Sequence, residues 1–121
     1  MKIAVCCNEN NENCMINNRL GRSPWLGVYD DQSESWSFIE NTQNLNAAQG
    51  AGIQTAQNIV NTGAEVLLTN NSGPKAMQVL QMAKIKVYQA PMDKTIDDCI
   101  KLYKSDDLDP ISSANVEGHW I

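Results

Sequence analysis

The chain has 121 residues, of which 42% are hydrophobic and 19% are charged, and its formal net charge is −5. This length suits one domain with a substantial core, while the acidic balance and the scattered lysines exclude the basic surface of a nucleic-acid-binding protein. No apolar run is long enough to span a bilayer, and the opening segment lacks the apolar core of a signal peptide. We therefore expect a cytoplasmic protein with reduced thiols and with neither nucleic-acid nor membrane partners.

The first third of the chain is typical of three strands joined by polar connections. Residues 2–7 form a short apolar run that stops at Asn8, which predicts a buried strand. A long polar loop covers residues 8–24. Two further β-rich runs, 25–29 and 36–40, flank a polar turn and predict a hairpin.

Helices and strands alternate in the rest of the chain. The apolar spacing predicts, in order, a helix over 53–60, a buried strand over 64–69, a helix from Pro74 to Ala83, a strand over 85–88 and a helix over 96–103. The order strand-strand-strand-helix-strand-helix-strand-helix is typical of an α/β protein with a mixed five-stranded sheet. Its parallel crossovers should be right-handed, which places helices on both faces of the sheet.

The domain boundary is expected just after the last predicted helix. In this interpretation residues 1–104 form a single α/β domain, and residues 105–121 form a C-terminal tail without clear periodicity. The tail carries His119, the only histidine, and ends in Trp120 and Ile121. These apolar residues could dock on their own domain or on another chain, so a monomer and a weak homodimer both stay open.

The carboxyl edge of the predicted parallel strands is where a ligand is expected in this class of sheet. The segment NNSGP, residues 70–74, follows the fourth strand and opens a helix, with Ser72 as a candidate N-cap. The segment QGAGIQ, residues 49–54, opens the preceding helix. Helix openings present unpaired N–H groups and the positive end of the helix dipole, so both segments favour anions. Alternatively, the glycines only permit a tight turn or close helix packing.

Two arginines complete the candidate anion site. Arg19 and Arg22 are the only arginines in the chain, and they precede the second strand beside the predicted pocket. Guanidinium groups suit anionic ligands because they donate paired hydrogen bonds, although an ordinary surface position is the alternative. The full set of candidate binding residues is Arg19, Arg22, Gly50, Gly52, Asn71, Ser72 and Gly73.

Three of the four cysteines, Cys6, Cys7 and Cys14, lie close together at the end of the first strand. Thiolates bind soft metals and iron–sulfur species, which makes these residues, together with His119, candidate metal ligands. The spacing Cys-Cys-x6-Cys matches neither zinc nor ferredoxin sites. Neighbouring strand residues also point to opposite faces, so in the alternative interpretation one of the adjacent pair is a small core residue. Cys99 lies on the apolar stripe of the last helix and is expected in the core.

The sequence offers little support for an enzyme. A nucleophilic triad would have to recruit the single histidine from the chain end, and the predicted strand ends lack the clustered carboxylates of a metal-dependent hydrolase. The segment around Gly50 has Thr55 where a dinucleotide-binding motif requires its third glycine. A non-enzymatic binding role is therefore favoured.

Three motifs occur in order along the chain. They are an FGR-type segment before the second strand (Gly21, Arg22), a GGAGIQ-type helix start (Gly50 to Gln54) and a T-x-x-x-GP-x-A turn (Thr69, Gly73, Pro74 and Ala76). With these motifs the sequence resembles the dinitrogenase iron–molybdenum cofactor biosynthesis family over residues 2–104. Arg19 stands where many relatives of that family carry a histidine.

The resemblance implies a ribonuclease-H-like fold without nuclease activity. It also implies non-enzymatic binding or carrying of an anionic metal–sulfur cluster of the Fe–Mo–S, Fe–S or Mo–Cu–S type, with metallocluster donor and acceptor proteins as partners. Cys6, Cys7 or Cys14 could take the place of the missing histidine as ligands. Two alternatives stay open: an enzyme or regulatory module that binds a small organic anion at the same helix starts, and an interaction protein with a vestigial pocket.

Overall fold

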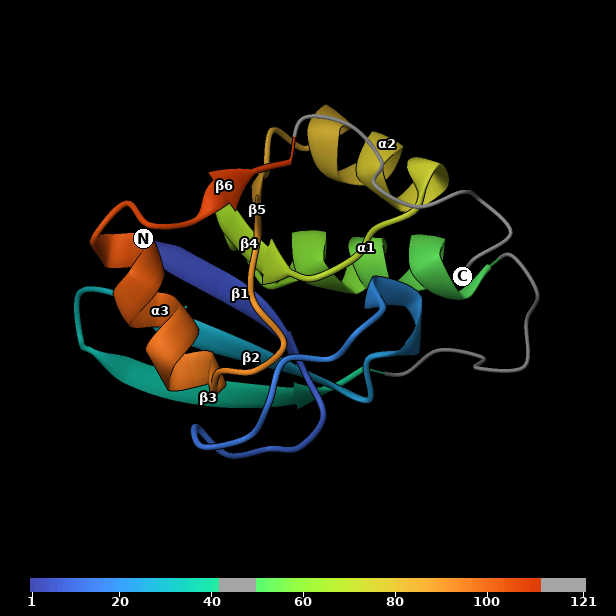
Figure 1. The fold of residues 1–121 in the computed structure, drawn as a ribbon. Helices are drawn as coiled ribbons and strands as arrows, with labels where there is room; N and C mark the ends of the chain where they lie inside the picture. Colours follow the sequence, from blue (N-terminus) through green and yellow to red (C-terminus); the bar gives the residue numbers. More distant parts are fainter. Residues whose placement is uncertain (42–49, 112–121) are drawn as a thin grey trace.

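A computed structural model of the chain describes residues 1–41 and 50–111 (Figure 1). These residues form a mixed six-stranded sheet with the strand order β3-β2-β1-β4-β5-β6. The strands are β1 (Lys2–Cys7), β2 (Trp25–Asp30), β3 (Ser35–Glu40), β4 (Val66–Thr69), β5 (Lys86–Gln89) and β6 (Asp109–Pro110). The helices are α1 (Ala51–Asn61), α2 (Pro74–Met82) and α3 (Ile96–Lys104), with a 3-10 turn η1 at Leu20–Arg22.

The predicted α/β class is confirmed, but the predicted five-stranded sheet is wrong, because the sheet has six strands and the chain continues to a strand after α3. The sixth strand, β6, pairs antiparallel with β5 at the sheet edge. Just beyond it, the Ile111 N–H donates to the Val87 carbonyl at 2.8 Å, and just before it Leu108 is buried. A strand of two residues has no alternation from which a sequence pattern could predict it.

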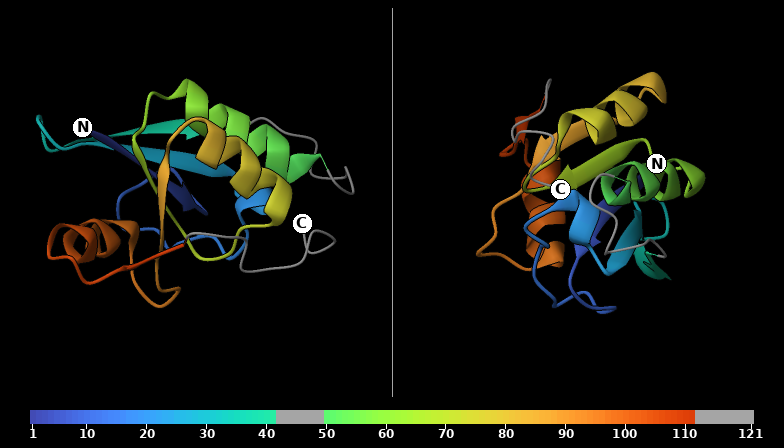
Figure 2. Two further views of the ribbon diagram at one scale, coloured as in Figure 1. Left: turned by 90° about the horizontal axis from the view of Figure 1, so that it is seen from above. Right: turned by 90° about the vertical axis from the view of Figure 1, so that its right-hand side faces the viewer.

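The direction of the strands brings the start of α1 to the sheet edge at which a ligand is expected. The central strand β1 pairs antiparallel with β2 and parallel with β4, and β2 pairs antiparallel with β3. Strand β3 therefore runs in the same direction as β1 and ends at the same edge. Figures 1 and 2 show that η1 and the starts of α1 and α2 lie together at one end of the molecule.

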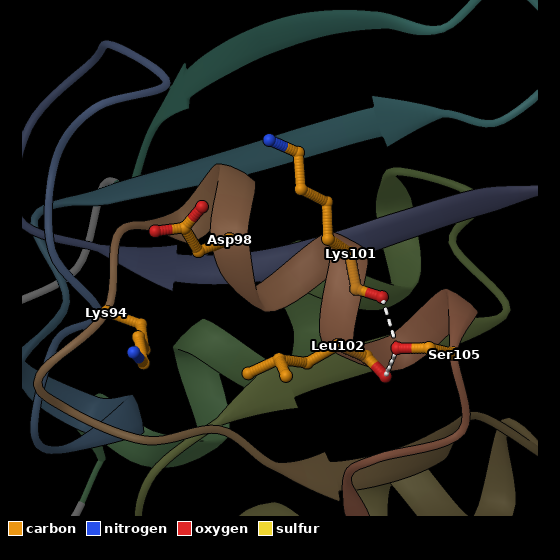
Figure 3. A pocket seen from close by; sticks show the side chains of 5 residues that line it. All are labelled: Lys94, Asp98, Lys101, Leu102 and Ser105. Atoms are coloured by element: carbon orange, nitrogen blue, oxygen red, sulfur yellow. Dashed lines mark hydrogen bonds between the residues drawn. The ribbon is translucent and has the colours of Figure 1, made fainter.

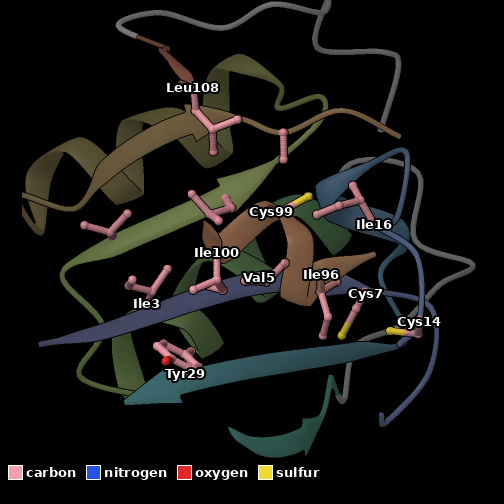
Figure 4. Packing of buried hydrophobic residues seen from close by; sticks show 13 residues of the cluster. Ile3, Val5, Cys7, Cys14, Ile16, Tyr29, Ile96, Cys99, Ile100 and Leu108 are labelled. Carbon is pink, nitrogen blue, oxygen red and sulfur yellow. The ribbon is translucent and has the colours of Figure 1, made fainter. Parts of the chain in front are cut away.

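Two hydrophobic clusters lie on opposite faces of the sheet, as predicted for helices on both faces. Helices α1 and α2 cover one cluster, which includes Ile59, Leu67 and Leu80. Helix α3 covers the other, which includes Val5 and Ile96 (Figure 4). Each fully buried aliphatic side chain of this kind contributes about 1.5–3 kcal/mol, so the two layers together hold the sheet and its loops in place.

The helix starts differ in how they are capped. Thr95 is the N-cap of α3, and its side chain accepts a hydrogen bond from the Asp98 N–H. Helix α2 begins at Pro74 with Gly73 as its N-cap, so the expectation that Ser72 caps this helix is wrong.

None of the helices in residues 1–41 and 50–111 has the length and apolar character needed to cross a bilayer.

Candidate anion-binding site

The loop after β1 returns alongside that strand before it reaches the arginines. Ile16 forms an antiparallel bridge with Cys7, and the Asn17 N–H donates to the Cys6 carbonyl at 3.0 Å. The Asn17 side-chain oxygen then accepts a hydrogen bond from the Arg19 N–H at 2.9 Å. The sheet edge thus fixes the backbone that carries Arg19.

Asn71, in the loop after β4, ties that loop to the arginine segment. Its carbonyl accepts a hydrogen bond from the Leu20 N–H at 3.1 Å, next to a parallel bridge between Arg19 and Asn71. Its side-chain Nδ2 donates to Asn18, with 3.0 Å to the carbonyl and 2.8 Å to the side-chain oxygen. Asn70 connects the same loop to the loop after β5, because its side-chain Nδ2 donates to the Ala90 carbonyl at 2.9 Å. Loops from β1, β4 and β5 are therefore joined.

A cleft of about 370 Å³, here called the arginine cleft, is lined by Asn17, Asn18, Arg19 and Arg22. Arg19 is half-buried and Arg22 is exposed. The lining residues offer two permanently positive guanidinium groups and two carboxamides, and no carboxylate is among them. Guanidinium groups donate several hydrogen bonds in a fixed fork, so the cleft suits an anion with more than one acceptor atom.

The remaining residues of the expected anion site surround the arginine cleft without lining it. Gly50 is the N-cap of α1, and Gly52 is buried in its first turn, where α1 contacts η1. Ser72 and Gly73 are buried at the start of α2. The N-terminal ends of both helices lie at the same end of the molecule as η1, which carries Arg22 (Figure 1), and their dipoles add positive potential there.

The cysteines of the expected metal site are divided between the two faces of the sheet. Cys6 belongs to the cluster under α1 and α2 and faces the hydroxyls of Ser23 and Thr69. Burial raises the pKa of Cys6 to about 12, and the neighbouring hydroxyls of Thr69 and Ser23 oppose part of this rise. Cys7 and Cys14 belong to the cluster under α3, and burial is the largest cause of the raised pKa of Cys7.

The structure therefore does not bring the three thiols together, and none of them lines the arginine cleft. Cys99 is buried against the sheet, as expected. Within residues 1–41 and 50–111, no three His, Cys, Asp or Glu side chains are arranged so that they could hold a metal ion. The candidate ligand His119 lies outside the described residues.

A buried polar network that the sequence did not indicate connects η1 to α1. The Asn41 side chain donates to the Ser23 carbonyl at 2.7 Å and to the Thr55 hydroxyl at 2.9 Å, and it accepts from Asn58 at 2.7 Å. The Ser23 hydroxyl lies 2.7 Å from the Trp25 carbonyl, to which it donates. Single polar residues in a chain rich in asparagine and serine carry no pattern that marks them as buried. Likewise, no sequence pattern marks Asn17 and Asn18 as residues that line the arginine cleft.

A second cleft of about 320 Å³, here called the α3 cleft, is lined by Lys94, Asp98, Lys101, Leu102 and Ser105 (Figure 3). Its positive charges are accompanied by carboxylates. Asp98 is part of the lining, and Lys101 Nζ lies 3.5 Å from Asp97 Oδ2. The Ser105 hydroxyl donates to the Lys101 and Leu102 carbonyls at the end of the helix. This cleft is less suited to an anion.

The fold and the arginine cleft together define an α/β domain with a positively charged cleft at one sheet edge. The chain belongs to the dinitrogenase iron–molybdenum cofactor family, whose sequence model matches residues 1–106. This confirms the resemblance that the three sequence motifs indicated. Membership of this family indicates a cofactor-binding or carrier role.

The proteins to which the chain is similar include the following three. The apo form of the orange protein from Desulfovibrio gigas has a TM-score of 0.90 at 30% identity, with 95% of this chain and 96% of that chain covered. The NMR structure of a protein assigned as NifB from Thermotoga has a TM-score of 0.83 at 26% identity, covering 97% and 98%. An uncharacterized protein of Methanocaldococcus jannaschii is 35% identical over 96 residues, which is 72% of this chain and 78% of that protein.

Proposed function

We propose that this protein holds an anionic metal–sulfur cluster in the arginine cleft and carries it between metallocluster donor and acceptor proteins. The observation that carries this proposal is the lining of the cleft: two guanidinium groups and two carboxamides without a carboxylate. Family membership and the similarity to the orange protein support the same class of cargo. The cluster is cargo here, and the protein's part is to bind and release it.

The charge distribution of the chain fits this role. The formal net charge of −5 would repel an anion from most of the surface. Both arginines of the chain nevertheless lie in one cleft, and the positive ends of two helix dipoles lie at the same end of the molecule as η1, which carries Arg22. An anion should therefore bind only where this local charge outweighs the net charge.

The donor set of the cleft predicts non-covalent binding. Guanidinium and carboxamide N–H groups donate hydrogen bonds to sulfide and oxide ligands of a cluster, whereas a direct metal bond requires thiolate, imidazole or carboxylate ligands. A cluster held only by hydrogen bonds can leave without ligand exchange at a metal. This property suits a carrier.

Anaerobic reconstitution tests the proposal. The apoprotein is incubated with iron, sulfide and either molybdate or tetrathiomolybdate, and is then separated from small molecules by gel filtration. We expect bound molybdenum and a charge-transfer absorption band, both lost in the Arg19→Ala/Arg22→Ala variant. Absence of bound metal in the unaltered chain would contradict the proposal. Thermal stabilisation by carboxylate metabolites in that case would support the organic-anion alternative.

The cysteines are tested in the same experiment. Cys6→Ser and Cys14→Ser should both retain the absorption band, because neither thiol lines the arginine cleft. Far-UV circular dichroism checks that each variant is folded. Loss of the band in a folded cysteine variant would show that a thiol is a cluster ligand and would replace the non-covalent mode with a covalent one.

A further inference from the structure

The loop after β1 brings two cysteines together on the α3 face of the sheet. Cys7 ends β1, and Ile16 pairs with it in an antiparallel bridge. In such a pairing the residue two positions before Ile16 is the diagonal neighbour of Cys7 on the same face. That residue is Cys14. Figure 4 shows the two sulfur atoms directed toward each other within the core cluster.

The electrostatic environment of Cys7 agrees with this placement. The Cys14 thiol is among the groups that raise the pKa of Cys7, after burial as the largest cause. In addition, the Cys7 Sγ lies 3.6 Å from the Trp25 carbonyl, and the Cys14 Sγ lies 3.3 Å from the Glu9 carbonyl. These contacts hold both side chains at the base of the loop over residues 8–13.

The other two thiols lie elsewhere in the core. Cys6 points to the opposite face of β1 and packs under α1 and α2. Cys99 lies on α3, with its Sγ 4.0 Å from the Pro91 carbonyl, and Figure 4 shows it apart from the pair. A reaction that needs two adjacent sulfur atoms therefore selects Cys7 and Cys14.

We propose that Cys7 and Cys14 form an oxidation site, in which the two thiols close to an internal disulfide by exchange with a small-molecule disulfide. Cys14 reacts first, because it is 5% exposed whereas Cys7 is fully buried. Its thiolate attacks one sulfur of the reagent, and one reagent thiolate leaves. Cys7 then loses its proton and attacks the Cys14 sulfur, which releases the second reagent thiolate. Two protein thiols are oxidised and one reagent disulfide is reduced to two thiols.

The bond would close the loop at a position linked to the arginine cleft. Across this loop the Asn17 side chain donates to the Asn8 side-chain oxygen at 2.7 Å. Asn17 also lines the cleft and accepts from the Arg19 N–H. The oxidation site is therefore separate from the anion-binding groups but adjoins the segment that carries them, and it does not depend on the identity of the cargo.

The test treats the folded full-length chain with oxidised glutathione, then alkylates the remaining thiols in denaturant and measures the mass. We expect two of the four thiols to be lost, with a mass decrease of about 2 Da before alkylation. Proteolysis after Glu9 and Glu12 separates Cys7 from Cys14 in the sequence. The fragments that carry them should stay linked until a reductant is added.

Two matched variants identify the partner of Cys14. Cys6→Ala should form the linkage as the unaltered chain does, whereas Cys7→Ala should stop at a glutathione adduct on Cys14. A linkage that persists in Cys7→Ala, a persistent adduct on Cys14 in the unaltered chain, or four free thiols would each overturn the proposal. The Cys6→Ala result decides between the two adjacent cysteines even where Cys7→Ala fails to fold.

Discussion

The arginine cleft and the α3 cleft are similar in volume, about 370 and 320 Å³. They differ in the charge of their lining residues and in the number of chain segments that hold those residues in place. The arginine cleft is lined by guanidinium and carboxamide groups only. The α3 cleft combines two ammonium groups with the carboxylate of Asp98, and a further carboxylate lies beside Lys101. Volume therefore does not distinguish them, whereas the balance of charge does.

The backbone that supports each cleft differs as well. Asn17 and Asn71 tie the arginine segment to β1 and to the loop after β4, so the segment is held from two sides. All residues that line the α3 cleft come from α3 and the residues next to it. A site held by several elements keeps its donors in place before the ligand arrives, which reduces the entropy lost on binding. The comparison predicts that anions prefer the arginine cleft.

Removal of both guanidinium groups should have the largest effect. A hydrogen bond to a charged group contributes about 1.5–3 kcal/mol, so Arg19→Ala/Arg22→Ala should weaken tetrathiomolybdate binding about 100-fold or more. Equilibrium dialysis under anaerobic conditions measures the change. The matched control, Lys94→Ala/Lys101→Ala, should leave affinity within a factor of about two, because it removes the same charge from the other cleft. Equal losses in both double variants would remove the distinction between the clefts.

Loss of the tie between the loops should have an intermediate effect. Asn71→Ala removes the side-chain donor to Asn18, so it should lower the free energy of unfolding by about 1 kcal/mol. Anion affinity should also fall by a few-fold, since Arg19 loses part of its support. Urea denaturation and dialysis measure the two quantities. The control Asn61→Ala changes an exposed asparagine on α1 and should alter neither; unchanged affinity in folded Asn71→Ala would show that this tie does not organise the cleft.

The smallest effect is expected on α3. The Lys101 side chain is 72% exposed and pairs with Asp97 one helical turn away. Exposed pairs of this kind contribute about 0.3–0.5 kcal/mol, so Lys101→Ala should lower the free energy of unfolding by no more than that. Urea denaturation at low and high salt measures it. A loss above about 1 kcal/mol would mean that the α3 cleft is more tightly built than its exposed charges indicate.

Much of the fold was predictable because its signals are local. The apolar run of β1 and the helical spacing of Ile96, Cys99 and Ile100 are read directly from neighbouring residues. The pairing of β6 with β5 was not predictable, because two residues carry no period and their partner lies about twenty positions away. The N-cap of α2 is Gly73, one residue after the predicted Ser72. Assignments of helix ends commonly differ by one or two residues.

The candidate site was predictable in its charged residues and not in its polar ones. Arg19 and Arg22 stand out in the sequence because they are its only arginines, and in the structure both line one cleft. The Asn71 side chain also connects two loops through Asn18, which no sequence pattern indicates. The pairing of Cys7 with Cys14 depends on the return of the loop beside β1, which no spacing rule contains.

The most direct test of the central claim is to map anion binding onto the nitrogen-15-labelled protein by NMR under anaerobic conditions. Tetrathiomolybdate is added stepwise, and the backbone amide and arginine side-chain signals are followed. We predict saturable shifts at residues 17–22 and 71–73 and at the side-chain nitrogens of Arg19 and Arg22. Shifts confined to residues 94–105, or no shifts at all, would contradict the account.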